Sequence, residues 1–198
     1  MRPMPRSAAA VLLIACMGVA STASAQERKG FWFDLESGVG SVHVSSDSGS
    51  SDRMWGGIGS LAAGWAVTSR LLAGVEMRLT SLDVSGDIVG TVDLYNVTGR
   101  VAYYPYRSRG FFVKGAAGGT FVDLNIDQQG TTFTATIAKG LGLGAGVGYD
   151  FYVGRGLSFT PAVTYWYGRT GGWKVFGETF FAGWSHDVVD MTIGVSLH

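Results

Sequence analysis

Apolar side chains alternate with small or polar ones along most of the chain after residue 25, in eight segments separated by turn-rich stretches. In the last segment, Met191 and Ile193 lie on one face, and Thr192 and Gly194 lie on the other. A period of two residues is typical of β-strands. We therefore expect strands at residues 31–44, 57–68, 71–82, 92–103, 111–123, 132–149, 157–168 and 186–197.

The sense of this alternation distinguishes two kinds of barrel. One face is continuous in Leu, Val, Ile and aromatic side chains, and the other holds small, polar and charged ones, such as the alternate glycines of residues 140–148. In a membrane barrel the apolar face contacts lipid, and each tilted strand needs ~9–11 residues. A soluble lipocalin-type barrel, the rival interpretation, has the inverse arrangement. The sequence thus predicts an all-β fold, an eight-stranded antiparallel up-and-down transmembrane β-barrel.

Six charged side chains fall on the predicted interior face: Asp34, Glu36, Glu76, Arg78, Arg100 and Lys114. An isolated charge in a low-dielectric interior is unfavourable, whereas paired charges are tolerated. Because three of the six are acids and three are bases, we predict a neutral ion-pair network inside the barrel. The glycines of residues 140–148 leave room for Arg100, Lys114 or Trp166 opposite them.

The connections between the predicted strands alternate between long and short. Longer segments rich in Ser, Gly, Asp and Thr lie at residues 45–56, 83–91, 124–131 and 169–185, and tighter turns lie at residues 69–70, 104–110 and 150–156. Outer-membrane barrels have short periplasmic turns and longer external loops. The pattern therefore predicts chain termini in the periplasm and four longer segments outside. Aromatic side chains near both ends of the strands are typical of the two interfacial girdles.

The first 25 residues have the features of a secretory signal peptide. Arg2 and Arg6 precede an apolar run at residues 7–20, and small residues provide a cleavage site before Gln26. The run is shorter than the ~20 residues of a transmembrane helix. Cys16 lies in a sequence that matches a lipidation motif, which is the alternative to cleavage after residue 25. We expect a signal peptide at residues 1–25 and one outer-membrane β-barrel domain at residues 26–198.

Charge and cysteine content narrow the candidate functions. Removing residues 1–25 takes away two arginines and no acid, which leaves 13 basic and 15 acidic residues and a formal charge of −2. A chain without a strongly basic patch is not expected to bind nucleic acid. The same removal takes away the only cysteine, so no disulfide or thiolate metal site is expected.

Candidate catalytic or metal-binding groups are sparse. The three histidines, His43, His186 and His198, are scattered, so we expect no metal site and no cofactor. Ser185-His186-Asp187 contains the residue types of a hydrolytic triad, but consecutive residues of a strand point to opposite faces and cannot form it. We therefore expect no catalytic residues and no enzymatic activity.

The longest predicted loop carries five aromatic residues: Trp173, Phe176, Phe180, Phe181 and Trp184. An exposed aromatic cluster is a possible contact surface for a ligand, a partner or lipopolysaccharide. The alternative, which we favour, is that these side chains extend the outer girdle or fold over the barrel mouth.

Several local motifs are similar to those of known proteins: Gly30-Phe31-Trp32-Phe33, Asn96-Val97-Thr98-Gly99-Arg100-Val101-Ala102-Tyr103-Tyr104-Pro105, Phe111-Phe112-Val113-Lys114-Gly115 and Ile193-Gly194-Val195-Ser196-Leu197-His198. With the eight alternating segments, they make residues 26–198 resemble the small outer-membrane β-barrel families (OmpX-like, OmpW-like and porin-like β-barrel domain proteins). The family's terminal assembly signal usually ends in Phe, and Leu197-His198 departs from it.

The resemblance implies a location in the bacterial outer membrane, contact with its lipid and with lipopolysaccharide, insertion by the barrel-assembly machinery, and a monomer. Eight strands leave an interior that side chains just fill. We therefore expect a structural or surface-interaction role through the external loops. The alternatives are a narrow pore or channel for small solutes or small apolar molecules and, less favoured, a lipid A-modifying enzyme.

Overall fold

The computed structural model describes residues 28–46, 49–84, 90–128, 131–154, 156–171, 174–175, 178–179 and 183–198. The predicted signal peptide at residues 1–25 lies outside this range. The strands are β1 (Phe31–Ser46), β2 (Gly49–Ser50), β3 (Met54–Thr68), β4 (Leu71–Val84), β5 (Gly90–Tyr103), β6 (Phe111–Gln128), β7 (Thr131–Tyr149), β8 (Phe151–Gly154), β9 (Leu157–Thr170), β10 (Lys174–Val175), β11 (Glu178–Thr179) and β12 (Trp184–Leu197). Among the described residues, no helix is long and apolar enough to cross a membrane, a criterion that does not apply to strands.

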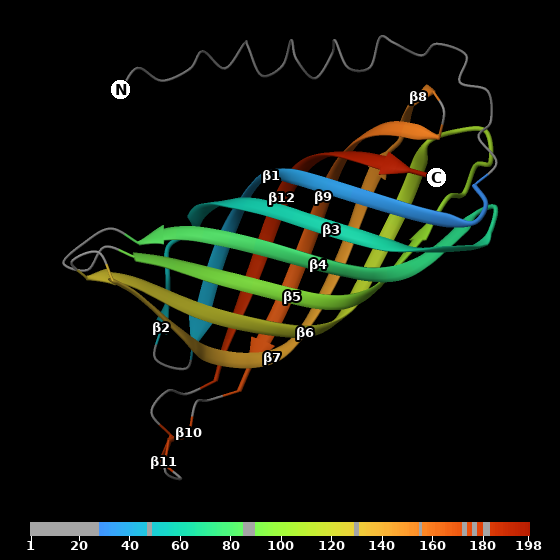
Figure 1. Cartoon of the computed structure of the whole chain (residues 1–198). Coiled ribbons are helices and arrows are strands. Elements are labelled where there is room, and N and C mark those ends of the chain that lie inside the picture. Colours follow the sequence, from blue (N-terminus) through green and yellow to red (C-terminus); the bar gives the residue numbers. More distant parts are fainter. Residues whose placement is uncertain are drawn as a thin grey trace, which may run out of the picture.

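Eight long strands form one closed antiparallel barrel (Figure 1). Their order around the barrel is β1, β3, β4, β5, β6, β7, β9 and β12. Closure comes from β12, which pairs with β9 from Trp184↔Thr170 to Leu197↔Leu157 and with β1 from Ser46↔Trp184 to Phe33↔Leu197. The predicted eight-stranded up-and-down barrel is thus confirmed.

The barrel has a short-turn end and a long-loop end. The described chain enters β1 and leaves β12 at the short-turn end, on the right of Figure 1, where residues 69–70, 104–110 and 150–156 connect the strands. Backbone hydrogen bonds join neighbouring segments around this end: Ala66 N to Gly30 O, Tyr104 N to Arg70 O, Asp150 N to Gly110 O, and His198 N to Gly156 O. The short-turn end is therefore a tied rim rather than a set of independent turns.

The strands extend beyond their predicted bounds mainly at the long-loop end. β6 and β7 stay paired as far as Gln128↔Thr131, whereas β7 pairs with β9 only between residues 140 and 148. The wall formed by β4 to β7 therefore projects past the rest of the barrel. At the other end, the predicted turn at residues 150–156 contains the short strand β8, which pairs with the start of β9.

The two faces of the barrel wall differ as the alternation predicts. The side chains of Leu141, Met191 and Ile193 point outward and are 74%, 57% and 58% exposed. Their sequence neighbours Asp190 and Thr192 point inward and are buried. Apolar side chains on the outer surface and polar side chains inside are the arrangement of a membrane barrel. The soluble lipocalin-type alternative is therefore wrong.

Candidate functional site

The six charged residues predicted to face the interior are all buried there. Asp34 and Glu36 come from β1, Glu76 and Arg78 from β4, Arg100 from β5 and Lys114 from β6. None is more than 5% exposed. Alternation along each strand turns these side chains into the barrel, and closure of the sheet places them at similar depth. We call this group, together with Asp190 of β12, the lumen network.

Arg100 is the centre of the lumen network. Its guanidinium donates to Asp34 Oδ2 over 2.7 Å, and it lies 3.5 Å from Glu36 Oε1 and 3.8 Å from Glu76 Oε2. Its Cζ is also 5.4 Å from the centre of the Trp32 ring, within range of a cation–π interaction. Because β5 and β1 are not neighbours in the sheet, the Arg100–Asp34 pair ties two separate walls of the barrel across the lumen.

A second cross-lumen tie joins β6 to β1. Lys114 Nζ donates to both carboxylate oxygens of Glu36, each over 2.9 Å. Thr192 Oγ1 of β12 also donates to Glu36 Oε2, over 2.9 Å. Glu36 thus accepts hydrogen bonds from two sides, which is the condition under which a buried carboxylate is tolerated.

Arg78 links the network to an acid that is not among the six predicted interior charges. Its guanidinium pairs with Asp190 and lies 3.6 Å from Glu76 Oε1. Glu76 Oε1 also accepts a hydrogen bond from Ser60 over 3.1 Å. The alternation that identified the other six residues also puts Asp190 on the interior face, so this signal was present in the sequence. With Asp190, the lumen network has four acids and three bases among the described residues.

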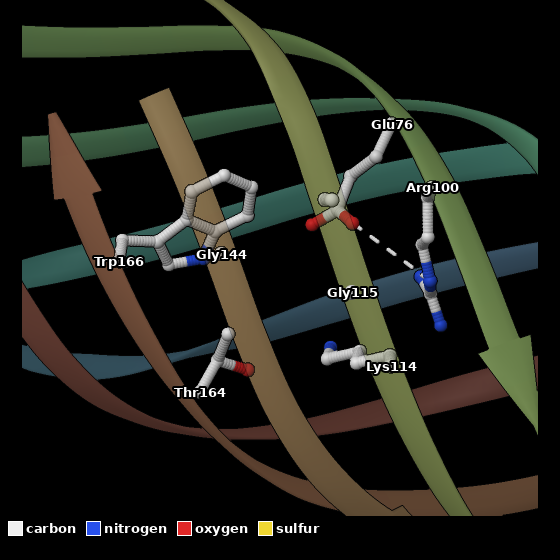
Figure 2. Close-up of a pocket in the computed structure, with 8 residues that line it drawn as sticks. Glu76, Arg100, Lys114, Gly115, Gly144, Thr164 and Trp166 are labelled. Carbon is white, nitrogen blue, oxygen red and sulfur yellow. Dashed lines mark ion pairs between the residues drawn. The ribbon is translucent and has the colours of Figure 1, made fainter. Parts of the chain in front are cut away.

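The space inside the network is narrow. Figure 2 shows Trp166 lying across Gly144, with Glu76 and Arg100 on the other side of the gap and Lys114 below. The gap between these side chains is too narrow to hold a water molecule. A Cβ atom on Gly144 would lie 2.8 Å from the Trp166 ring, so glycine is what lets this ring fill the lumen.

Apolar layers cover the network at both ends. At the long-loop end the buried cluster consists of Val42, Ile58, Leu82, Leu94, Val122, Ala138, Trp166 and Val188. At the short-turn end it consists of Trp32, Ala62, Leu72, Ala102, Tyr104 and Phe112. Along its axis the barrel therefore presents an apolar, a charged and again an apolar layer, each made of buried side chains.

A second polar cluster, the Asp150 clasp, closes the short-turn end. Asp150 accepts hydrogen bonds from Tyr104 Oη over 2.8 Å and from Thr160 Oγ1 over 2.9 Å. Arg28 Nη2 lies 3.7 Å and His198 Nε2 3.4 Å from its Oδ2. Arg28 also stacks on the Tyr104 ring, with Cζ 3.6 Å from the ring centre. The clasp thus joins residues from the start, middle and end of the described chain.

The pKa of Asp150 follows from these contacts. Burial opposes ionisation, but hydrogen bonding and charge from His198, with the hydrogen bonds from Tyr104 and Thr160, hold the pKa of this carboxyl below its ordinary value. Burial and the neighbouring Asp150 carboxylate raise the pKa of Tyr104 well above its ordinary value. Tyr104 therefore remains a protonated donor to an ionised Asp150 at neutral pH.

Only one residue of the predicted aromatic loop surface can be located. Trp173, Phe176, Phe180 and Phe181 lie outside the residues whose side chains are described. Trp184 is half-buried, packs against the apolar layer of the long-loop end, and has its ring centre 6.1 Å from that of His186.

The Ser185-His186-Asp187 sequence does not assemble as a triad. His186 points inward and is buried, whereas Asp187 on the outer face pairs with His43 Nδ1 at 3.1 Å and with Arg53 Nη2 at 2.7 Å. Within the described part of the chain, no group of three or more His, Cys, Asp or Glu side chains is arranged to hold a metal ion.

Comparisons with known proteins agree with this architecture. Neisserial surface protein A has a TM-score of 0.55 and 18% sequence identity, with 87% of this chain and 99% of that chain covered. Ail, the attachment invasion locus protein of Yersinia pestis, has a TM-score of 0.57 and 13% identity, with 85% and 99% covered. At these identities the likeness shows the fold alone. No curated protein matches the sequence.

The family comparison covers most of the chain, because residues 8–186 match the family described as "Outer membrane protein beta-barrel domain". The apolar outer surface, the polar lumen and the closed antiparallel sheet are features of outer-membrane β-barrels. The chain therefore belongs to the outer membrane protein beta-barrel domain family and is a protein of the bacterial outer membrane.

Proposed function

We propose that this protein is a sealed barrel that contributes to the envelope as a structural element and interacts with its surroundings at the long-loop end, without passing solutes. The observation that carries the proposal is the lumen network, in which Arg100 and Lys114 reach across the barrel to carboxylates on β1. The apolar layers on both sides of the network support the same conclusion, because a water path would have to cross all three.

The energetics favour a permanent seal over a gate. A channel needs side chains that move aside, whereas Arg100, Glu36 and Lys114 hold one another in a low-dielectric interior. Separating one member of a buried ion pair from its partner costs about 3–5 kcal/mol. Opening the lumen would break several such pairs at once. The lumen network is therefore suited to holding the walls together.

We further propose the orientation that the connection lengths predict, with the short-turn end in the periplasm and the long-loop end outside. In this orientation the outer face contacts outer-membrane lipid, and lipopolysaccharide surrounds the long-loop end. Insertion by the barrel-assembly machinery and a monomeric state belong to the same proposal.

Planar-bilayer conductance tests the seal. Purified protein that shows the heat-dependent gel mobility of a folded barrel should give no stable openings. A variant that combines Arg100→Ala, Lys114→Ala and Trp166→Ala removes side chains from the narrowest region and serves as the comparison. Stable ohmic openings of the wild-type protein would contradict the proposal and favour the pore or channel alternative.

Mass spectrometry of lipid A, with and without expression, tests the enzyme alternative, and a modified lipid A would contradict a non-enzymatic role.

A further inference from the structure

Exposed charges are unevenly distributed between the two ends of the barrel. The described residues of the short-turn end include the exposed cations Lys29, Arg70, Arg107 and Arg109. Asp150 is the only acid among the described residues of the chain start and the short turns, and it is buried in the clasp. Glu27 and Arg155, adjacent in sequence to this end, lie outside the described residues and have opposite charges. The surface of the short-turn end is therefore cationic.

The long-loop end has the opposite balance. Its described outward positions include five acids, Asp52, Asp83, Asp93, Asp123 and Asp187, against three cations, Arg53, Lys139 and Arg169, and Arg53 is paired with Asp187. The mature chain has a formal charge near −2. The cations of the short-turn end are therefore concentrated at that end and do not result from an excess of basic residues in the whole chain. The barrel is thus charged asymmetrically along its axis.

A backbone hydrogen bond holds the turns that carry three of these cations next to each other. The amide of Tyr104, at the start of the turn that carries Arg107 and Arg109, donates to the carbonyl of Arg70 over 2.8 Å. Two turns that carry three exposed arginines are therefore joined side by side. We call Arg70, Arg107 and Arg109 the arginine arc. Because this arrangement is fixed by backbone bonds, a ligand that binds several of these cations does not have to order the turns first.

Aromatic side chains lie beside the arc at the depth of a membrane interface. Trp65 and Tyr103 point outward from the ends of their strands and are 63% and 48% exposed, and the Trp65 ring packs edge-on against Phe31 at 5.2 Å. Arg109 lies over the Tyr106 ring, with Cζ 5.5 Å from the ring centre. Exposed aromatic rings of this kind sit at the level of lipid headgroups. The turns that carry the arginine arc follow directly after these strand ends, so we expect the guanidinium groups near the lipid phosphates.

We propose that the arginine arc is a binding surface for the phosphate headgroups of anionic phospholipids in the leaflet next to the short-turn end. Arginine binds phosphate through paired hydrogen bonds, and one cation near an anionic membrane surface strengthens association roughly fivefold. The arc recruits such lipids around the short-turn end and fixes the depth of the barrel in the bilayer. This role goes beyond the sealed barrel and does not depend on whether the lumen conducts.

Trp65 is a reporter beside the arc. The protein is refolded into phosphatidylcholine vesicles that contain a fixed fraction of brominated phosphatidylglycerol or, in a parallel sample, brominated phosphatidylcholine. The difference in fluorescence between the wild-type protein and a Trp65→Phe variant isolates the quenching of Trp65. We expect brominated phosphatidylglycerol to quench Trp65 at least twofold more strongly, an excess that shrinks between about 0.05 M and about 0.5 M salt because the headgroup contacts are screened.

Two triple variants of equal charge change separate a local effect from the overall charge. Arg70→Gln, Arg107→Gln and Arg109→Gln should abolish the excess quenching, whereas Arg53→Gln, Lys139→Gln and Arg169→Gln at the other end should leave it unchanged. Both variants are checked for folding by gel mobility and for silence in planar bilayers. Equal quenching of the wild-type protein by the two brominated lipids, or an equal loss in both triple variants, would overturn the proposal without affecting the sealed lumen.

Discussion

His198 Nε2 lies 3.4 Å from Asp150 Oδ2, so the last residue of the chain is held by a carboxylate from the turn between β7 and β8. The His198 side chain is buried, and its ring lies edge-on to Tyr104 at 6.4 Å. Leu197, one residue earlier, points outward and is 46% exposed. The side chain that follows the outward-facing Leu197 thus turns inward and helps to close the short-turn end.

Replacing Asp150 by Asn should lower stability and flatten its pH dependence. Because the folded-state pKa of Asp150 is lowered, its contribution is complete above the ordinary carboxyl pKa of 3.8 and is lost as the pH falls through the lowered value. At neutral pH we expect a loss of about 1.5–3 kcal/mol, the range for hydrogen bonds to a charged group. Urea unfolding in detergent from about pH 7 to about pH 3 measures both effects. An unchanged pH profile in the variant would show that Asp150 is not the titrating group.

Replacing Arg100 by Met should be among the most destabilising single changes in the lumen. The variant leaves Asp34 without its 2.7 Å partner and removes a cation near Glu36 and Glu76. The expected loss is about 3–5 kcal/mol in the free energy of unfolding. A double variant with Asp34→Asn should recover part of this loss, because coupled partners are non-additive by about 0.5–3 kcal/mol. Additive effects in the urea-unfolding cycle would contradict a direct Arg100–Asp34 interaction.

Removing the charge of Asp190 and removing the charge of Arg78 should lower the stability of the barrel by unequal amounts. The lumen network has four acids and three bases. Asp190→Asn therefore leaves equal numbers of acids and bases, whereas Arg78→Met leaves two more acids than bases. We expect Arg78→Met to cost about 3–5 kcal/mol and Asp190→Asn to cost at least about 1 kcal/mol less. Unfolding midpoints of the two variants under the same conditions test this order, and the reverse order would contradict it.

Gly144 and Gly115 provide a matched pair of glycine substitutions. A Cβ atom on Gly144 would meet the Trp166 ring at 2.8 Å, whereas around Gly115 the nearest heavy atom is 3.9 Å away. Gly144→Leu should therefore displace Trp166 and destabilise the barrel by about 1–3 kcal/mol, with a shift in tryptophan emission. Gly115→Leu adds apolar surface on the outer face and should have little effect. Similar losses in both variants would contradict a role of Gly144 in seating Trp166.

The sequence predicted strand limits at one end of the barrel better than at the other. The strand ends at Phe31, Thr68, Leu71, Tyr103 and Phe111 agree with the expected ones, and all lie at the short-turn end. At the long-loop end β6 continues to Gln128, five residues past its expected limit. Lipid on one face and a packed lumen on the other impose the alternation of apolar and polar residues. Where the strands leave the membrane, this constraint ends and the alternation is lost. Backbone pairing continues there without that signal.

The sequence by itself determined the architecture, because lipid contact and burial impose a period of two on every residue that crosses the membrane. It also determined which face each charge occupies, as the positions of Arg100 and Asp34 illustrate. Only the tertiary structure decided the partners, since Arg100 meets Asp34 across a lumen whose shape depends on closure of β12 against β1 and β9. The Asp150 clasp was likewise decided by that closure, because it joins Arg28, Tyr104 and His198, which no local pattern connects.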